Sequence, residues 1–181
     1  MASQKRILVL VGPSGSGKST VSDLLVEKDI PKLVTSTTRK PRQGEENGVH
    51  YYFRTIEQMK EEPFIEQTFY AENIYGLSVR EVENKLTKQD TVQVTLDKNG
   101  ARVMKEQFAQ ETKVIFFQIT EEEMMERMAK RGDTLESIEK RIDFCRTTKE
   151  LEPPEDTDLI ISKGTPQEIT QQILKNFNDR L

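Results

Sequence analysis

The segment Gly12–Ser19 has the spacing G-x-x-x-x-G-K-S and directly follows the apolar run Ile7–Val11. The apolar run predicts a buried strand over residues 6–11, and the apolar face of the next segment predicts a helix over 18–28. Glycines at this spacing let the backbone curl so that successive N–H groups point into one hollow, toward which the helix directs its positive end. The order of strand, loop and helix therefore predicts a phosphate-binding loop.

The residue types in this loop indicate a nucleoside triphosphate bound with Mg²⁺. Lys18 is placed to reach the β- and γ-phosphates, and the Ser19 hydroxyl to take one coordination position on the metal ion. A dinucleotide fits less well, because Thr20 stands where that fingerprint requires a third small residue. The expected ATP-binding residues of the loop are Gly12, Pro13, Ser14, Gly15, Ser16, Gly17, Lys18, Ser19 and Thr20.

Length and composition restrict the class of protein. A chain of 181 residues suits one domain, and 32% charged with 34% hydrophobic residues is typical of a globular protein with a polar surface. The net charge of −4 gives no general attraction to nucleic acid. The sequence has one cysteine, Cys145, and one histidine, His50, which excludes an internal disulfide and any paired-histidine site. We expect neither a signal peptide nor a membrane span, and thus a cytoplasmic protein.

From residue 78 onward, the apolar pattern alternates between helices and strands. We expect helix 78–88, strand 91–96, helix 98–109, strand 113–119, helices 121–130 and 135–150, strand 158–162 and helix 166–178. Between residues 32 and 75, short strands, a polar loop at 37–49 and a short helix at 55–62 indicate a small inserted β-subdomain. The alternation implies a parallel sheet covered on both faces, with a ligand crevice at the carboxyl ends of its strands, where Gly12 and Asp97 lie.

A second anion site is predicted in the polar loop. The segment Thr35–Glu45 concentrates hydroxyl groups and basic side chains at the end of the second strand. Arg39 and Arg42, held apart by Pro41, form a fork suited to a phosphate dianion. By itself such a loop is more often a solvated basic surface. Its position beside a triphosphate loop instead indicates a transferase that moves a phosphoryl group to a monophosphate.

The chain resembles the guanylate kinases, P-loop kinases that transfer a phosphoryl group from ATP to GMP, over nearly its whole length. The matching blocks are Gly12–Ser19, the pattern S-T-T-R-x-P-R-x-G-E-x-x-G-x-x-Y-x-F over 36–53, Phe64-Ile65-Glu66 with Tyr75-Gly76, Leu96-Asp97-x-x-Gly100-Ala101, and Arg127-x-x-x-Arg131-Gly132 with Arg141. The resemblance implies a three-layer α/β core around a parallel five-stranded sheet, an inserted mixed β-subdomain that binds the monophosphate, and a helical lid. The implied boundaries within a single domain of residues 1–181 are core 1–34, 78–126 and 142–181, monophosphate-binding subdomain 35–77 and lid 127–141.

The resemblance also assigns the acceptor site. The guanine base is implied to meet Glu66, Thr35 and Asp97. A carboxylate at Glu66 suits guanine because N1–H and the N2 amino group are adjacent donors, which adenine does not present. The implied GMP-binding residues are Thr35, Ser36, Arg39, Arg42, Tyr51, Glu66, Tyr75, Gly76 and Asp97.

The lid arginines Arg127, Arg131 and Arg141 are implied to reach the triphosphate and the transferring group when the lid closes. Arg127 fits equally well an exposed helix face on which it pairs with a nearby glutamate, Glu123 or Glu126. The implied catalytic residues are Lys18, Arg39, Asp97, Arg131 and Arg141, and Arg127 and Arg131 also count as ATP-binding residues. Asp97 would orient Lys18 or Mg²⁺-bound water, or approach the guanine amino group. The acceptor phosphate is a dianion and needs no general base.

Three positions depart from the family pattern. Leu77 stands where a hydroxyl usually touches the base, Thr95 replaces an acidic residue two positions before Asp97, and Ser162 lies where an Asn is typical near the adenine end of ATP. Because each lost hydrogen bond weakens recognition, we expect guanine selectivity that is reduced but not inverted.

The expected function is Mg²⁺- and ATP-dependent phosphorylation of GMP, and of dGMP, to the diphosphate in purine nucleotide metabolism. Two alternatives remain: a related kinase with a different acceptor, suggested by Leu77 and Thr95, and a non-catalytic binding module, which the intact Gly17–Ser19 disfavours. The expected partners are ATP and GMP, without nucleic acid or membrane, in a monomer or weak homodimer.

Overall fold

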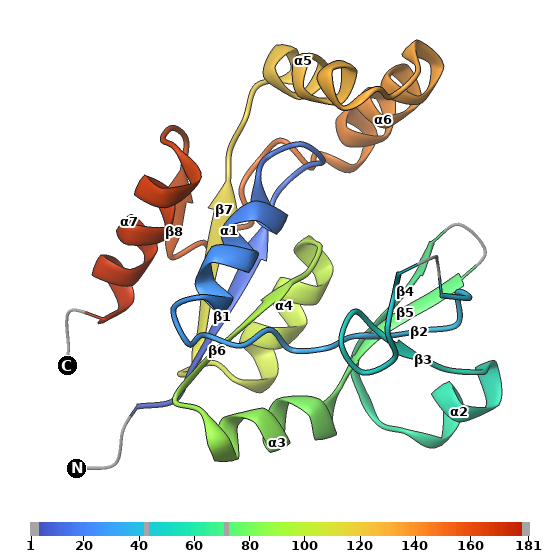
Figure 1. Ribbon diagram of the computed structural model, residues 1–181, viewed down its shortest axis with the longest axis vertical. Helices are drawn as coiled ribbons and strands as arrows, with labels where there is room; N and C mark the ends of the chain where they lie inside the picture. The colour runs from blue at the N-terminus through green and yellow to red at the C-terminus, as the bar shows by residue number, and fades with distance from the viewer. Residues whose placement is uncertain (1–3, 42–43, 71–72, 179–181) are drawn as a thin grey trace.

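The computed structural model describes residues 4–41, 44–70 and 73–178. In this part of the chain, a parallel sheet has the strand order β6-β1-β7-β8, formed by Thr91–Thr95, Arg6–Val11, Thr112–Phe117 and Leu159–Ile161. Helices α1 (Lys18–Val26) and α7 (Pro166–Asn178) cover one face of it, and α3 (Val79–Lys88) and α4 (Lys98–Gln107) cover the other (Figure 1). The expected three-layer α/β core is confirmed.

The central strand β1 contributes to two separate hydrophobic cores. Ile7, Val9 and Val11 pack with the α3 and α4 side, whereas Leu8 and Leu10 pack with α1 and α7. Each of these five side chains is at most 2% exposed. A strand whose alternate residues enter two cores must be apolar throughout, which explains the uninterrupted apolar run that precedes the loop.

The sequence predicts five strands in this sheet, but among the described residues it has four. The predicted strand at 32–36 is reduced to one parallel bridge between Lys32 and Gln93. Its two hydrogen bonds run from the Leu33 N–H to the Gln93 oxygen over 2.7 Å and from the Gln93 N–H to the Pro31 oxygen over 3.0 Å. Pro31 has no N–H to extend the pairing, and the chain then leaves for the inserted sheet, in which Ser36 begins β2.

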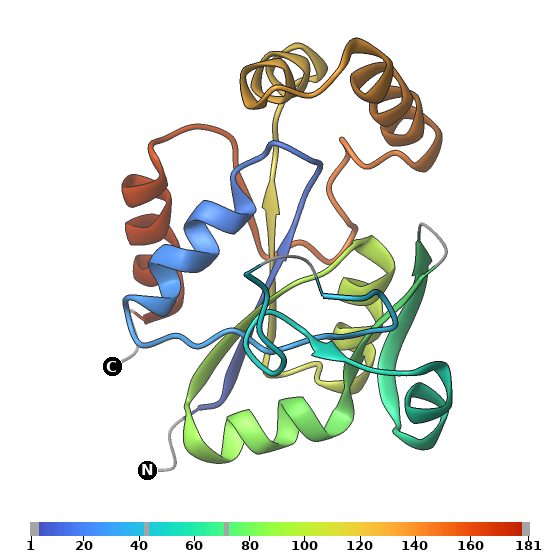
Figure 2. The same ribbon diagram turned by 45° about the vertical axis from the view of Figure 1, so that its right-hand side comes forward.

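The inserted subdomain is a mixed sheet with the strand order β3-β2-β5-β4. Its strands are β2 (Ser36–Thr37), β3 (Tyr52–Phe53), β4 (Phe64–Tyr70) and β5 (Asn73–Ser78), with α2 (Ile56–Glu61) between β3 and β4. Strand β2 is parallel to β3, and β5 is antiparallel to β2 and β4. Figure 2 shows this sheet on the opposite side of the core from α1 and α7.

A buried carboxylate fixes the inserted sheet to the core. Glu81 on α3 is 6% exposed and accepts hydrogen bonds from the Val34 N–H over 2.9 Å and from the Tyr52 hydroxyl over 3.0 Å. The Glu81 N–H in turn donates to Ser78 Oγ, which caps α3. Because Glu81 binds both the chain entering the sheet and strand β3, it sets the position of the residues carried by β2 and β3.

Helices α5 (Glu121–Arg131) and α6 (Leu135–Thr148) form a third unit, which lies beyond the carboxyl ends of β1 and β7 (Figure 1). They have a hydrophobic cluster of their own, which includes Met124, Met128, Ile138 and Ile142. The cluster extends from Ile119 to Leu151. We therefore propose that the lid is wider than residues 127–141. No helix among the described residues is long and apolar enough to span a membrane.

Candidate active site

The loop between β1 and α1 has the curled form that its sequence predicts. Gly12, Gly15 and Gly17 have φ angles of 153°, 75° and 94°. A Cβ atom at Gly12 would lie 2.7 Å from the backbone oxygen of Phe117, so this position has no room for a side chain. Gly17 is the N-cap of α1, and the unpaired N–H groups of the first helical turn point into the same hollow.

Lys18 folds back over this loop. Its ammonium group donates to the Gly12 oxygen over 2.5 Å, to the Pro13 oxygen over 2.7 Å and to Ser16 Oγ over 3.2 Å. Burial lowers the pKa of Lys18 to about 8, partly opposed by the negative charge of Glu150. An anionic phosphate in the hollow would favour the charged ammonium and raise this pKa again.

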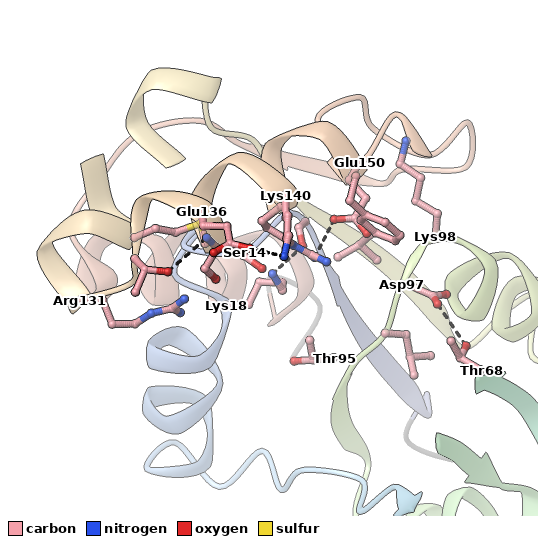
Figure 3. A pocket seen from close by; sticks show the side chains of 18 of the residues that line it. Ser14, Lys18, Thr68, Thr95, Asp97, Lys98, Arg131, Glu136, Lys140 and Glu150 are labelled. Atoms are coloured by element: carbon pink, nitrogen blue, oxygen red, sulfur yellow. Dashed lines mark hydrogen bonds and ion pairs between the residues drawn. The ribbon is translucent and has the colours of Figure 1, made fainter. Parts of the chain in front are cut away.

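Lys18 faces a cavity of about 1090 Å³ that all three units of the molecule line. The core contributes the loop and the end of β6, the inserted subdomain contributes Tyr51 and Thr68, and the lid contributes side chains of α5 and α6. Figure 3 shows Lys18 and Arg131 toward one end and Asp97 and Thr68 toward the other. A volume this large is at the upper limit, roughly 1,000 Å³, of pockets for one drug-sized ligand, so the cavity suits two ligands side by side.

Two lid arginines line the cavity, and each is held by a carboxylate. Arg141 donates to Glu150 Oε2 over 2.9 Å, and its guanidinium carbon lies 5.0 Å from the centroid of the Phe144 ring. Arg131 is paired with Asp133. Each guanidinium group is therefore oriented by a carboxylate, which a more strongly charged phosphate group could replace as its partner.

Arg127 lies outside the cavity wall and contacts the loop itself. Its Nη1 donates to the Gly15 oxygen over 2.9 Å, which joins α5 to the phosphate-binding loop. The two glutamates considered as its partners are engaged elsewhere: Glu126 pairs with Lys130, and Glu123 accepts the Thr120 N–H. The exposed-face alternative for Arg127 is therefore less well supported than a role at the loop.

Arg39, Tyr51 and Tyr75 come together in the inserted sheet. The Arg39 guanidinium carbon lies 5.5 Å from the centroid of the Tyr51 ring and 5.9 Å from that of Phe53, and the rings of Tyr51 and Tyr75 are 6.1 Å apart. Arg39 donates to Glu45 Oε1 over 2.8 Å, and this hydrogen bond raises the pKa of Arg39. The guanidinium is thus held in one orientation by aromatic faces and by an ion pair.

The position of Glu66 depends on an irregularity in the β4–β5 ladder. Phe64 pairs with Ser78 and Glu66 with Leu77, so Ile65 is an extra residue on β4. A bulge of this kind re-aims the side chains around it. Ile65 accordingly packs in the hydrophobic core, 5% exposed, while the neighbouring Glu66 turns toward α4.

Glu66 and Asp97 meet at a shared hydroxyl group. Thr68 Oγ1 lies 3.3 Å from Glu66 Oε2 and 3.2 Å from Asp97 Oδ2. Asp97 is the N-cap of α4, with its Oδ1 accepting the Gly100 N–H over 2.7 Å. Burial, followed by the charge of Asp97, raises the pKa of Glu66 to about 7. The charge of Asp97 therefore favours the protonated form of Glu66.

The structure brings some, but not all, of the sequence-predicted residues to the cavity wall. Ser36 and Gly76 are register partners on the opposite face of the inserted sheet from Tyr75, and Ser36 is 1% exposed. Thr35 uses its backbone oxygen to accept the Tyr52 N–H. Arg42 lies outside the described residues. The predicted residues in the cavity wall are Gly12, Ser14, Lys18, Tyr51, Asp97, Arg131 and Arg141.

The cavity wall also contains residues that were not among the predicted site residues, and Thr68, Glu150 and Lys98 are three of them. Thr68 joins the two carboxylates, and Glu150 holds Arg141. Lys98 donates to the backbone oxygen of Lys149 at the end of α6, and burial lowers the pKa of Lys98. Strand alternation places Thr68 on the same face as Glu66, whereas no local pattern connects Glu150 or Lys98 to the site.

The fold and the site together define the class of protein. The phosphate-binding loop follows the first strand of a parallel sheet, and an inserted sheet and a helical lid surround one cavity. This is the architecture of a P-loop kinase. The sequence model of the family described as guanylate kinase matches residues 4–179. The chain belongs to the guanylate kinase family.

Individual relatives agree with this assignment. The chain is 33% identical to the guanylate kinase of Prochlorococcus marinus (strain MIT 9312), covering 97% of this chain and 98% of that protein, and 36% identical to that of Helicobacter pylori, covering 97% and 89%. The crystal structure of guanylate kinase from Anaplasma phagocytophilum superimposes with a TM-score of 0.74 at 26% identity, over 98% of this chain and 87% of that one. Shikimate kinase from Acinetobacter baumannii, at 17% identity and a TM-score of 0.54, shares the fold.

Proposed function

We propose that this protein transfers the γ-phosphoryl group of ATP to GMP and dGMP, which yields ADP and the diphosphate of the acceptor. The observation that carries the proposal is a single cavity with Lys18 at one end and, at the other, Thr68 and Asp97, which contact Glu66. A loop for a triphosphate and the Asp97 carboxylate thus open on one space, and Thr68 connects Glu66 to it. Direct transfer requires this proximity of donor and acceptor.

The acceptor nucleotide is proposed to lie against the inserted sheet. Arg39, Tyr51 and Tyr75 form the phosphate site, and the sequence resemblance assigns Arg42 to it as well. Arg39 would exchange its pair with Glu45 for a phosphate oxygen, a stronger partner because the phosphate carries more charge. Glu66 would accept hydrogen bonds from guanine N1–H and N2–H.

In the proposed reaction, an oxygen of the GMP phosphate attacks the γ-phosphorus of ATP. The bond from that phosphorus to the bridging oxygen breaks, and ADP leaves with this oxygen. Lys18, Arg131 and Arg141 neutralise the charge that develops on the transferring group. Closure of the lid would allow both arginines to exchange their carboxylate partners, Asp133 and Glu150, for phosphate oxygens.

Mg²⁺ is proposed to arrive with the nucleotide. Among the described residues, no group of three His, Cys, Asp or Glu side chains is arranged to hold a metal ion. Ser19 is exposed in the first turn of α1, and one hydroxyl ligand beside phosphate oxygens is a typical protein contribution to such a site. When bound, the ion would neutralise phosphate charge.

An acceptor panel tests the proposed function. ADP release from Mg·ATP is measured with GMP, dGMP, IMP, AMP and UMP, and the Lys18→Met variant serves as a control for contaminating kinases. We expect GMP and dGMP to have the highest kcat/KM. Faster turnover of AMP than of GMP would exclude the guanine assignment, and no turnover with any acceptor would favour a binding module.

A further inference from the structure

Thr68 occupies an unusual position between two carboxylates. Its hydroxyl oxygen is within hydrogen-bond distance of both Glu66 Oε2 and Asp97 Oδ2, and it lines the cavity (Figure 3). A hydroxyl group carries one proton and can donate to one acceptor at a time. Either one carboxylate lacks this donor, or a proton on one carboxyl group is donated to Thr68 Oγ1 while Thr68 donates to the other.

The backbone holds the three groups in place. Glu66 and Thr68 are two residues apart on β4 and therefore share one face of the sheet. Asp97 is fixed from the other side, because its second oxygen caps α4 through the Gly100 N–H. The Thr68 hydroxyl is thus a bridge between the inserted sheet and the core, and a change in its partner alters both carboxylates.

On the neighbouring strand, neither Leu77 nor Ser78 offers an equivalent hydroxyl to Glu66. Leu77, the register partner of Glu66, is fully buried and apolar. The Ser78 hydroxyl, one residue later, is used to cap α3 by accepting the Glu81 N–H. Within the described part of the β4–β5 pair, Thr68 is the hydroxyl-bearing residue hydrogen-bonded to the Glu66 carboxylate.

We propose that Thr68 is a specificity-determining positioning residue, whose hydroxyl couples Glu66 and Asp97 into one acceptor edge for a purine with adjacent N1–H and N2–H donors. The proposal rests on the proposed function of the same site. Glu66 is placed to accept from N1–H and N2–H, and Asp97 becomes a further acceptor on the amino side. IMP, which lacks the 2-amino group, would therefore gain less than GMP from this coupling.

The same geometry predicts that guanine binding displaces a proton. The interactions that act on Glu66 come from Thr68 on β4, from the Leu77 backbone on β5 and from Asp97 at the start of α4. Burial and, after it, the charge of Asp97 favour a protonated Glu66, and the two hydrogen bonds oppose this. A guanine that donates to Glu66 requires the ionised carboxylate, so the affinity for GMP should increase as the pH rises through about 7.

The experiment compares Thr68→Val, which removes the hydroxyl at nearly constant shape, with Thr68→Ser, which keeps it. The KM and kcat for GMP, IMP and ATP are measured from pH 6 to pH 9, and thermal unfolding confirms that each variant is folded. For Thr68→Val we expect a rise of about tenfold in the KM for GMP, a smaller rise for IMP and unchanged values of kcat and of the KM for ATP. Thr68→Ser should restore the wild-type ratio of GMP to IMP.

The outcomes separate this proposal from the proposed function. If the wild-type protein does not phosphorylate GMP, the proposed function fails before any variant is compared. If it does, and Thr68→Val keeps both the wild-type preference for GMP over IMP and the wild-type pH profile, the positioning role is excluded. Equal losses in Thr68→Val and Thr68→Ser would also exclude it, because the hydroxyl would then not be the active group. Should Thr68→Val fail to fold, Thr68→Ala provides the same comparison.

Discussion

Leu77 is the register partner of Glu66 in the antiparallel β4–β5 ladder, and its side chain is fully buried in the core cluster that also contains Ile65 and Val82. The position at which the family usually carries a base-contacting hydroxyl is therefore a packing position here. We predict that Leu77→Thr lowers the free energy of unfolding by about 2–4 kcal/mol, because it removes buried apolar volume and buries a hydroxyl. Chemical denaturation measures this loss.

The matched control is Leu77→Met, which conserves volume and should cost less than about 1.5 kcal/mol. We also expect no decrease in the KM for GMP in Leu77→Thr, since the new hydroxyl would lie in the core. A KM for GMP several-fold below that of the wild type would show instead that this position faces the base.

Lys18→Met should reduce turnover by about 100-fold or more, because the substitution removes the ammonium group that contacts the phosphate-binding loop. The same substitution has a pH signature. The folded-state pKa of Lys18, about 8, lies below the usual 10.5. Below pH 8 the buried ammonium is charged and lowers the free energy of unfolding by its full amount. This penalty disappears as the pH rises toward 10.5.

Unfolding curves of wild type and Lys18→Met between pH 7 and pH 11 test this signature. We expect wild-type stability to rise relative to the variant by about 3 kcal/mol over this range. A stability difference that is independent of pH would contradict the assigned pKa shift. ATP with Mg²⁺ should reduce this pH-dependent rise in wild-type stability, because phosphate favours the ammonium form of Lys18.

Glu66→Gln should lower kcat/KM for GMP by about 100-fold, because an amide cannot accept both guanine donors.

The effect of Glu66 on stability has the opposite pH dependence to that of Lys18. The folded-state pKa of about 7 lies above the usual 4.5, so the ionised carboxylate is a penalty that develops as the pH rises from 4.5 through 7.

We therefore expect Glu66→Gln to gain about 3 kcal/mol in the free energy of unfolding, relative to the wild type, between pH 4.5 and pH 8. Denaturation at several pH values measures it. Gln67→Glu, on the adjacent exposed position of β4, is a control that adds a carboxylate outside the site and should leave kcat/KM for GMP unchanged. Parallel pH curves for wild type and Glu66→Gln would contradict the prediction.

Arg39→Lys should raise the KM for GMP by about tenfold or more, with little change in the KM for ATP. Lysine keeps the charge but loses the planar fork and its packing between the Tyr51 and Phe53 rings. Steady-state kinetics with each substrate varied in turn measures the effect. An equal rise in both KM values would indicate a general disturbance of the fold, for which Arg102→Lys, an exposed ion-paired arginine on α4, is the matched control.

Much of the core was predictable because its signals are local. The alternation of strand and helix from residue 78 onward reflects which residues face the interior, and Pro and Gly mark where elements end. The same reasoning misjudged the segment at 32–36, whose apolar residues suit a strand but whose backbone partner, Gln93, is available at one bridge only. Pairing depends on where the chain goes next, which propensity does not contain.

The amino-acid sequence by itself determined the phosphate-binding loop, because the required backbone angles at Gly12, Gly15 and Gly17 and the position of Lys18 all lie within one short segment. Through resemblance it also predicted Glu66, Asp97 and the lid arginines as site residues. Only the tertiary structure decided that Thr68, which contacts Glu66, also reaches Asp97 29 positions further along the sequence, and that Glu150 holds Arg141. Such contacts follow from the bulge in β4, the cap of α4 and the packing of α6, and these arise only when the separate elements meet.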